Sequence, residues 1–259
     1  VLKDLKLVSW DEPYTVRRNR GIILGPDGQK MSKSKGNVVD PDEYVKKLGS
    51  DTVRMYLAFM GPFNEVGSYP WDPQSILGIR RFLDRVYTFY KNTSLKALPR
   101  KNKQTFQLDR MIHRVTKKVT DDIAGMHFNT AISQLMVTLT AMEGAPEQLS
   151  QDIVERYALL LAPFAPHLAE EAWSLMRQKG SIHQQPWPQF ESKLLEDTAF
   201  QLIVQINGKM RDKFEAPIAT TETEALQMAL AREAVIRSLN GASPKKVIFV
   251  PKRLLNIVV

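Results

Sequence analysis

The chain has 259 residues and a net charge of +8, and 43% of its residues are apolar, which is an ordinary fraction for a folded protein. It contains no cysteine, which excludes disulfides and thiolate metal sites. No apolar run approaches the roughly 20 residues that a membrane helix requires, so we expect no membrane partner and, with no visible leader peptide, a cytoplasmic location.

Residues 1–62 have the pattern of the end of an α/β domain. Residues 22–24 are apolar and stop at a Gly-Pro pair, which predicts a short strand followed by a turn. An Asp-Pro pair opens a predicted helix over 41–48, because aspartate caps a helix and proline suits its first turn. A second helix is predicted over about 51–60.

A lysine-rich loop separates the strand from the first helix. Residues 29–37 read Gln-Lys-Met-Ser-Lys-Ser-Lys-Gly-Asn, and glycines and a proline precede them. Ammonium groups, hydroxyls and exposed N–H groups gathered in one loop are suited to a polyphosphate. The glycine and lysine spacing of a Walker A loop is absent. The alternative is a surface loop whose lysines have no common role.

Residues 63–180 are predicted to form an antiparallel bundle of five amphipathic helices. Ile76, Ile79 and Leu83 illustrate the pattern, since apolar residues recur three and four positions apart. Proline and glycine residues separate the segments, and the first helix is expected to run until Pro99. The five helices are expected to begin near residues 73, 105, 130, 151 and 167.

Residues 181–198 are predicted to be a linker, and 199–259 a small α/β domain. The pair Asn207-Gly208 is typical of a tight hairpin turn. A capping box at residues 221–224 predicts the start of a helix. The expected elements are strands over 200–206 and 210–216, one helix over 221–239, and strands over 245–251 and 255–259.

Positive charge is unevenly distributed along the chain. Residues 73–120 contain twelve Lys or Arg and two acids, whereas 121–199 contain four basic and eleven acidic residues. Segregated positive charge is typical of a polyanion partner such as a nucleic acid, although solvated helices also carry many lysines. Strand alternation would place 209, 211 and 213 on one face. The candidate contacts are Arg80, Arg81, Arg85, Lys117, Lys118, Lys209, Arg211, Lys213, Lys245 and Lys246.

Four stretches resemble one known family. Residues 30–34, Lys-Met-Ser-Lys-Ser, match the KMSKS motif of class I aminoacyl-tRNA synthetases, and 35–41 continue as in the leucine, isoleucine and valine members. Residues 160–171 resemble the proline break of their anticodon-binding bundle. Residues 204–213 and the chain end resemble the C-terminal domain of bacterial leucyl-tRNA synthetases, which contacts the tRNA elbow. The last resemblance favours the leucine branch.

The resemblance implies a multidomain, mainly α protein. It would comprise the tail of a Rossmann-like catalytic domain, an anticodon-binding helical bundle and a C-terminal α/β tRNA-binding domain. The implied function is part of a leucine–tRNA ligase, which attaches leucine to tRNA(Leu) through leucyl-adenylate. ATP is the substrate, Mg²⁺ arrives with it, and no protein metal site is expected. Lys30 and Lys33 are the candidate catalytic residues, and the ATP-binding candidates are Lys30, Met31, Ser32, Lys33 and Ser34.

The second motif of the class, His-x-Gly-His, is absent and the chain begins at Val1. We therefore expect a piece of a longer protein, or a subunit, that is inactive alone. It would need an N-terminal catalytic and editing portion, in cis or as a separate chain. Two alternatives stay open at this point. One is a non-catalytic tRNA-binding protein derived from a synthetase, and the other is a fragment of an isoleucine or valine enzyme.

Overall fold

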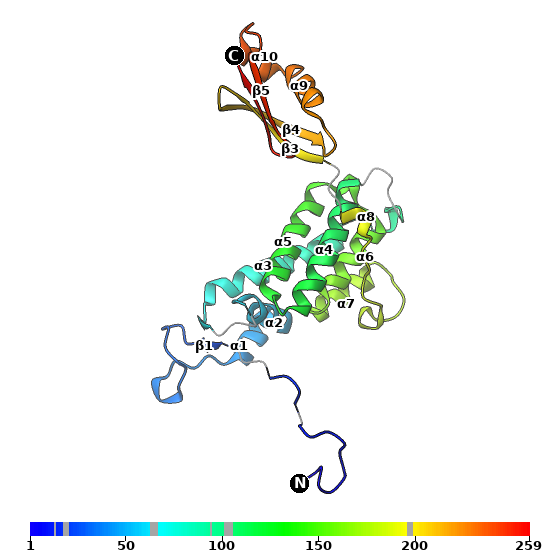
Figure 1. Ribbon diagram of the computed structural model, residues 1–259. Coiled ribbons are helices and arrows are strands. Elements are labelled where there is room, and N and C mark those ends of the chain that lie inside the picture. The colour runs from blue at the N-terminus through cyan, green and yellow to red at the C-terminus, as the bar shows by residue number, and fades with distance from the viewer. Residues whose placement is uncertain (13, 18–20, 63–66, 94, 101–105, 196–198) are drawn as a thin grey trace. The chain divides into compact units, whose positions relative to one another are not determined.

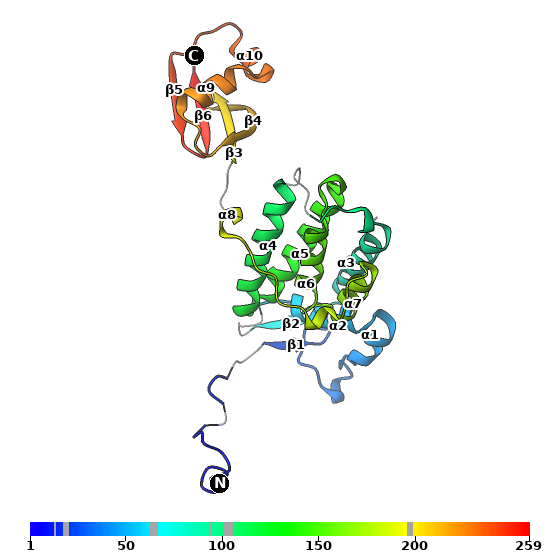
Figure 2. The ribbon, with the colours of Figure 1, turned by 90° about the vertical axis from the view of Figure 1, so that its right-hand side faces the viewer.

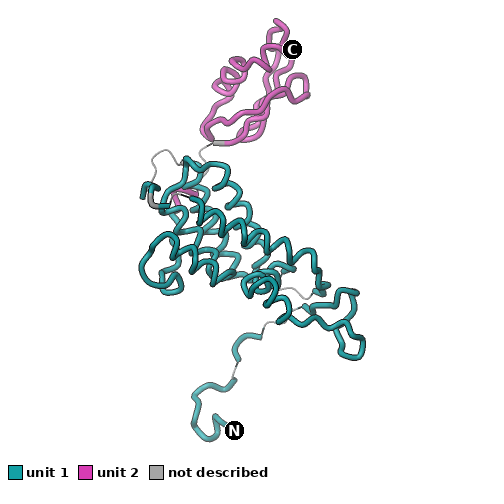
Figure 3. Tube along the Cα trace, turned by 180° about the vertical axis from the view of Figure 1, so that it is seen from behind, with its two compact units in different colours: residues 1–191 teal, residues 192–259 magenta. Residues whose placement is uncertain are grey.

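The computed structural model describes residues 1–259 except 13, 18–20, 63–66, 94, 101–105 and 196–198 (Figure 1). The described residues form two compact units, residues 1–191 and residues 192–259 (Figure 3). Each unit has its own apolar core. Among the described residues, no helix is both long and apolar enough to cross a membrane. The domain limits expected after residues 62, 180 and 198 stay predictions.

The first unit opens with two strands and two helices that frame the lysine-rich loop. The two strands pair in parallel, and the second was missed by the sequence prediction. Asp40 caps the first helix by accepting a hydrogen bond from the Asp42 N–H at 2.9 Å, as the Asp-Pro pair predicts. The elements are β1 (Ile22–Leu24), β2 (Ser68–Pro70), α1 (Pro41–Leu48) and α2 (Ser50–Phe59).

Five more helices follow and form the body of this unit (Figure 2). All five were predicted, but the first is shorter than expected, because it ends at Asn92 and Thr93 is already extended. A short 3₁₀ turn occupies Leu95–Ala97. The helices are α3 (Pro73–Asn92), α4 (Phe106–Ala124), α5 (Phe128–Gly144), α6 (Gln151–Leu161) and α7 (Pro166–Leu175).

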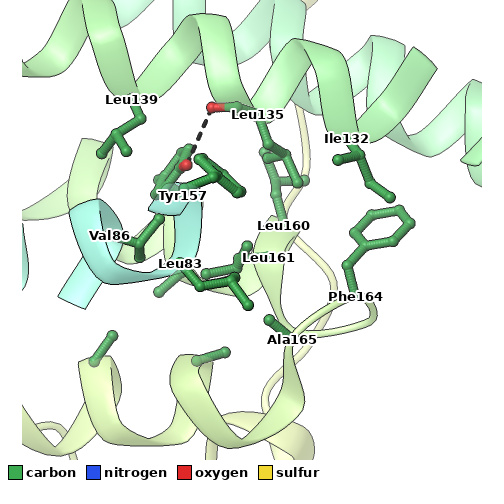
Figure 4. Close-up of a cluster of buried hydrophobic side chains, with 14 of the residues drawn as sticks. Leu83, Val86, Ile132, Leu135, Leu139, Tyr157, Leu160, Leu161, Phe164 and Ala165 are labelled. Carbon is green, nitrogen blue, oxygen red and sulfur yellow. Dashed lines mark hydrogen bonds between the residues drawn. The ribbon is translucent and has the colours of Figure 1, made fainter. Parts of the chain in front are cut away.

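The core of the first unit lies between these helices (Figure 4). The Tyr157 hydroxyl of α6 donates a hydrogen bond to the Leu135 carbonyl of α5 at 3.1 Å. Burial raises the pKa of this hydroxyl well above its ordinary value, so it stays neutral and the hydrogen bond persists. Met55 of α2 belongs to the same core. The helices that follow the lysine loop are therefore anchored in the bundle.

The second unit is a four-stranded sheet with two helices against one face. The sheet order is β4-β3-β6-β5, with β3 and β6 parallel and the outer pairs antiparallel. The predicted hairpin turn is confirmed, since Asn207 and Gly208 have φ values of 50° and 77°. The elements are α8 (Ser192–Leu195), β3 (Ala199–Ile206), β4 (Lys209–Pro217), α9 (Glu222–Leu230), α10 (Glu233–Leu239), β5 (Lys246–Val250) and β6 (Leu254–Val258).

The single helix predicted over 221–239 is wrong, because the structure has two helices separated at Arg232. The Arg232 backbone is extended, with φ −90° and ψ 128°. Its guanidinium donates to the Asp212 carboxylate of β4 at 2.7 Å and lies 5.3 Å from the centre of the Phe214 ring. These contacts with the sheet outweigh the local preference for helix, which is only a weak constraint.

The aromatic residues differ between the two cores. Trp71, Tyr90 and Trp173 are buried in the first. In the second, the aromatic side chains are phenylalanines, since the last tryptophan and the last tyrosine of the sequence are Trp187 and Tyr157. Residues Phe200, Phe214 and Phe249 pack against the second core.

Candidate functional site

The lysine-rich loop begins at the carboxyl end of β1. The Gly25 N–H donates to the Gln29 carbonyl at 2.8 Å, and the Gly28 N–H donates to the Gly25 carbonyl at 2.9 Å. A β-bridge joins Leu24 to Lys30. Residues 24–30 thus form a tight turn that returns the chain to the end of the strand, with Lys30 at its base.

The next residues form a single turn of 3₁₀ helix, Lys33–Lys35. Gly36 ends this turn in the left-handed region, with φ 66°, a conformation that glycine adopts without strain. The side chains of the three lysines are exposed, while Met31 is half-buried and packs against the core of the unit. Met31 is therefore placed as an anchor for the loop.

Two serines and one carboxylate complete the polar groups of the loop. The Ser32 and Ser34 hydroxyls lie 2.8 Å apart and hydrogen-bond each other. Hydrogen bonds from the Gln29 N–H and the Asn37 side chain, together with the charge of Lys35, lower the pKa of the Asp27 carboxyl. The loop thus brings together all five residues predicted to bind ATP. Its exposed ammonium and hydroxyl groups can neutralise and hydrogen-bond a polyphosphate.

The basic residues predicted on the helices of the first unit are mostly engaged in ion pairs. Arg80 pairs with Asp84 at 2.8 Å and donates to the Leu48 carbonyl at 3.0 Å. Arg85 pairs with Glu143 of α5 and lines an open groove between α3 and α5 with Arg81. Lys117 and Lys118 pair with the acids four residues later, Asp121 and Asp122.

These ion pairs change the interpretation of the uneven charge distribution along the sequence. Part of the acid-rich stretch folds against the base-rich stretch, as in the pair of Arg100 and Glu155, 2.7 Å apart. The two blocks that are separate in sequence therefore partly cancel in space. Exposed ion pairs contribute little stability, so these residues stay available to a polyanion, and their assignment as tRNA contacts stays a prediction.

The basic residues of β4 do not share one face, contrary to the expectation from alternation. Asp212 of β4 is opposite Val204 of β3, and Met210 is opposite Gln205. Arg211 lies between them as the extra residue of a β-bulge. Lys209 is opposite the buried Ile206, whereas Lys213 is opposite Ile203 on the other face. The three side chains are exposed, as are Lys245 and Lys246 at the start of β5.

One further group in the described residues has the composition of a metal site. Asp109, His113 and Asp152 each offer a ligand atom, all within 4.8 Å of one another. The His113 Nδ1 accepts a hydrogen bond from the Glu191 N–H at 3.0 Å, so the proton of the neutral ring lies on Nε2. Burial and the charge of Arg156 lower the pKa of His113. The group therefore fits a hydrogen-bonded structural cluster better than a cation site.

A serine, a histidine and an aspartate also meet, at the start of α2. The buried Asp51 carboxylate accepts hydrogen bonds from His167 Nδ1 and the Leu168 N–H, both at 2.8 Å. Ser50 Oγ lies 3.4 Å from the same His167 nitrogen. A catalytic relay uses both ring nitrogens, one for each partner. The cluster instead ties α2 to the first turn of α7.

Sequence reasoning missed the residues that hold the lysine loop in shape. Asn37 and Asp27 are ten residues apart, and the Asn37 Nδ2 donates to both Asp27 carboxylate oxygens, at 3.1 and 3.0 Å. A turn-forming aspartate followed by Gly28, and an asparagine directly after Gly36, were the available signals.

Comparisons with known proteins identify the family. Residues 5–66 match the family model of class I tRNA synthetases (I, L, M and V), and residues 107–226 match the anticodon-binding domain of tRNA ligase. The chain thus resembles the class I tRNA synthetases along most of its length. Its whole length is 43% identical to a leucine–tRNA ligase of Rubrobacter xylanophilus and 40% identical to one of Bdellovibrio bacteriovorus. The chain spans 32% of each of these synthetases.

The fold of the chain also has a counterpart among solved structures. The crystal structure of a ternary complex of Agrobacterium radiobacter K84 agnB2 LeuRS, tRNA and LeuAMS matches with a TM-score of 0.72 and 30% identity. The match covers 99% of this chain and 35% of that one. The sequence-based resemblance to bacterial leucyl-tRNA synthetases is thereby confirmed for the family and for the leucine branch.

Proposed function

We propose that this chain is the part of a leucine–tRNA ligase that supplies the ATP-facing lysine loop and the tRNA-binding surfaces. The complete protein would attach leucine to tRNA(Leu) through leucyl-adenylate. The observation that carries the proposal is an exposed lysine loop within a chain that resembles leucine–tRNA ligases from end to end. Alone, the chain would form no adenylate.

The proposed chemistry follows from where the charge develops. When a leucine carboxylate attacks the α-phosphorus of ATP, the bond to pyrophosphate breaks and negative charge builds on the leaving group. Lys30 and Lys33 would lie beside that group and stabilise the transition state more than bound ATP, which accelerates the reaction. ATP would bring its own Mg²⁺. The loop follows the carboxyl end of a parallel strand, which is where α/β sheets bind their ligands.

A missing partner is part of the proposal. Parallel sheets are normally large and covered on both faces, yet β1 and β2 form a pair in which Ile22 is 50% exposed. Leu57 of α2, which lines a pocket together with Ile23 of β1, is 39% exposed. The N-terminal catalytic and editing portion, in cis or as a separate chain, would extend this sheet and cover these side chains. A cytoplasmic location also stays part of the proposal.

The predicted tRNA contacts enter the proposal as one set of exposed basic residues on both units. Of the alternatives, a non-catalytic tRNA-binding protein has no need of phosphate-neutralising lysines, and the relatives above are leucine enzymes rather than isoleucine or valine enzymes. Neither alternative is favoured by an observation of its own. The set is Arg80, Arg81, Arg85, Lys117, Lys118, Lys209, Arg211, Lys213, Lys245 and Lys246.

The test is Lys33→Ala in a complete ligase that contains this segment. We expect ATP–pyrophosphate exchange to slow by roughly 10²–10³-fold, the usual effect of removing one donor that stabilises transition-state charge. Lys47→Ala is the control, because Lys47 is an exposed lysine of α1 outside the loop. Unchanged exchange in Lys33→Ala, or exchange activity in the isolated chain of residues 1–259, would overturn the proposal.

A further inference from the structure

The Asn37 side chain binds three separate points of the lysine loop. Its Oδ1 accepts a hydrogen bond from the Ser32 N–H at 2.8 Å. Its Nδ2 donates to the Lys30 carbonyl at 3.3 Å and to the Asp27 carboxylate. One half-buried carboxamide thus closes residues 30–37 into a hydrogen-bonded ring. Lys33 is one of the residues of this ring.

Asp27 is the fixed end of this arrangement. Its Oδ1 accepts a second hydrogen bond from the Gln29 N–H at 3.0 Å, so the carboxylate is held on both sides. Gly25 is buried beneath it, and a Cβ at Gly25 would lie 2.7 Å from Asp27 Oδ1 and 2.9 Å from the Asn37 carbonyl oxygen. The absence of a side chain at Gly25 therefore allows the two residues to meet.

A carboxylate beside a phosphate-binding loop would ordinarily repel the ligand. Here the Asp27 oxygens are directed to Asn37 and to the turn, and the Ser32 N–H is directed to Asn37. Neither side chain offers ATP a hydrogen-bond donor beyond those already used within the loop. Their contacts determine instead where the backbone of Lys30 and Lys33 lies.

We propose that Asn37 and Asp27 form an amide–carboxylate clamp that positions Lys30 and Lys33 for the phosphates of ATP. They are positioning residues, not catalytic ones, and the inference rests on the function proposed above. Misplacing a catalytic group by about 1 Å can lower a rate by roughly 10²-fold. Loss of the clamp should therefore lower kcat while leaving the lysines, and most ATP affinity, in place.

The test compares a single variant with an exchanged pair. Asn37→Asp sets two carboxylates against each other and opens the clamp, whereas Asp27→Asn combined with Asn37→Asp restores one amide opposite one carboxylate. In the complete ligase, we expect kcat for ATP–pyrophosphate exchange to fall roughly 10- to 100-fold in the single variant, with little change in KM for ATP. The exchanged pair should recover part of the loss, because a carboxylate at position 37 can still accept from the Ser32 N–H but cannot donate to the Lys30 carbonyl.

A second measurement uses the chain of residues 1–259 and needs no activity. Trypsin should cleave after Lys33 and Lys35 faster in Asn37→Asp than in the wild type, and the exchanged pair should return toward the wild-type rate. Cleavage after Lys47 reports general unfolding and should not change. Gln29→Ala is the matched control, because its backbone N–H, rather than its side chain, contacts Asp27.

The outcomes separate the two proposals. Wild-type kcat and cleavage rates in Asn37→Asp would overturn the clamp even if Lys33→Ala is slow. A second outcome is faster trypsin cleavage in Asn37→Asp together with wild-type ATP–pyrophosphate exchange in Lys33→Ala. This outcome would support the clamp as a structural feature of the loop. It would overturn both the function proposed for the lysines and the role of the clamp in catalysis.

Discussion

Two buried tyrosine hydroxyls connect neighbouring helices of the first unit. The Tyr90 hydroxyl of α3 donates to the Val154 carbonyl of α6 at 2.7 Å, and Tyr157 of α6 donates to Leu135 of α5. Burial raises the pKa of both hydroxyls, so each is a neutral donor at neutral pH. The two hydrogen bonds thus link three helices through polar contacts within an apolar core.

Tyr157→Phe should destabilise the first unit by about 1 kcal/mol, the usual net value of one such hydrogen bond. The ring remains, so no large cavity forms, and the shift in the urea midpoint should leave the slope of the transition unchanged. Tyr87→Phe is the control, because Tyr87 is 39% exposed and should change the midpoint little. Equal shifts in both variants would contradict the role given to the buried hydroxyl.

Single residues also mark how far the sequence predicts the site. The three lysines and two serines can be recognised from the sequence because they lie within one short stretch. The contact between Asn37 and Asp27 cannot be recognised in this way, because it depends on how the turn folds back on itself. The tRNA assignments are limited for a different reason, since a sequence does not show that Arg85 faces Glu143.

Helix and strand limits are predictable from the sequence wherever neighbouring residues determine them. Asp72 caps α3 by accepting from the Gln74 N–H at 2.8 Å, as an Asp-Pro pair predicts. The helix break at Arg232 and the bulge at Arg211 were not predictable in this way. Both lie next to the Asp212–Arg232 ion pair, which joins β4 to the α9–α10 junction. A contact between residues twenty apart leaves no local signal.

The Asp212–Arg232 pair should make the second unit sensitive to acid. The hydrogen bond from Arg232 lowers the pKa of the Asp212 carboxyl below its ordinary value of 3.8. A lowered pKa in the folded state adds stability above pH 3.8, and that stability is lost as pH falls further. Asp212→Asn should therefore destabilise the unit at pH 7 and make progressively less difference below pH 3.8.

Hydrogen exchange of the β3 and β4 amides, measured at several pH values, checks this expectation. Glu233→Gln is the control, because the Glu233–Arg237 pair lies on exposed side chains of α10, at 89% and 80%, and should contribute little at any pH. A loss of protection in Asp212→Asn that is the same at every pH would contradict an ionic origin.

At the scale of the whole molecule, the chain has two cores that share no residue. Leu202→Ala tests what this means for stability. Leu202 of β3 is fully buried, and removing its side chain should destabilise the second unit by about 2–5 kcal/mol. Amide exchange should rise throughout 199–259, and the helices α3 to α7 should keep their protection.

Ile236→Ala provides the comparison, because Ile236 of α10 is 53% exposed and its loss should alter exchange only slightly. If Leu202→Ala also released the amides of the bundle, the two units would unfold as one cooperative body. The division of the described residues into two compact units would then not describe the energetics of the chain.

The placement of tryptophan and tyrosine determines which unit an optical measurement reports on. Every tryptophan and tyrosine precedes residue 192, so intrinsic fluorescence and absorbance at 280 nm report on the first unit alone. A denaturation curve recorded in that way would not detect unfolding of the sheet that carries Lys209, Lys213 and Lys246. A tryptophan introduced at Phe249, a partly buried ring packed against the second core, would give that half of the molecule an optical signal of its own.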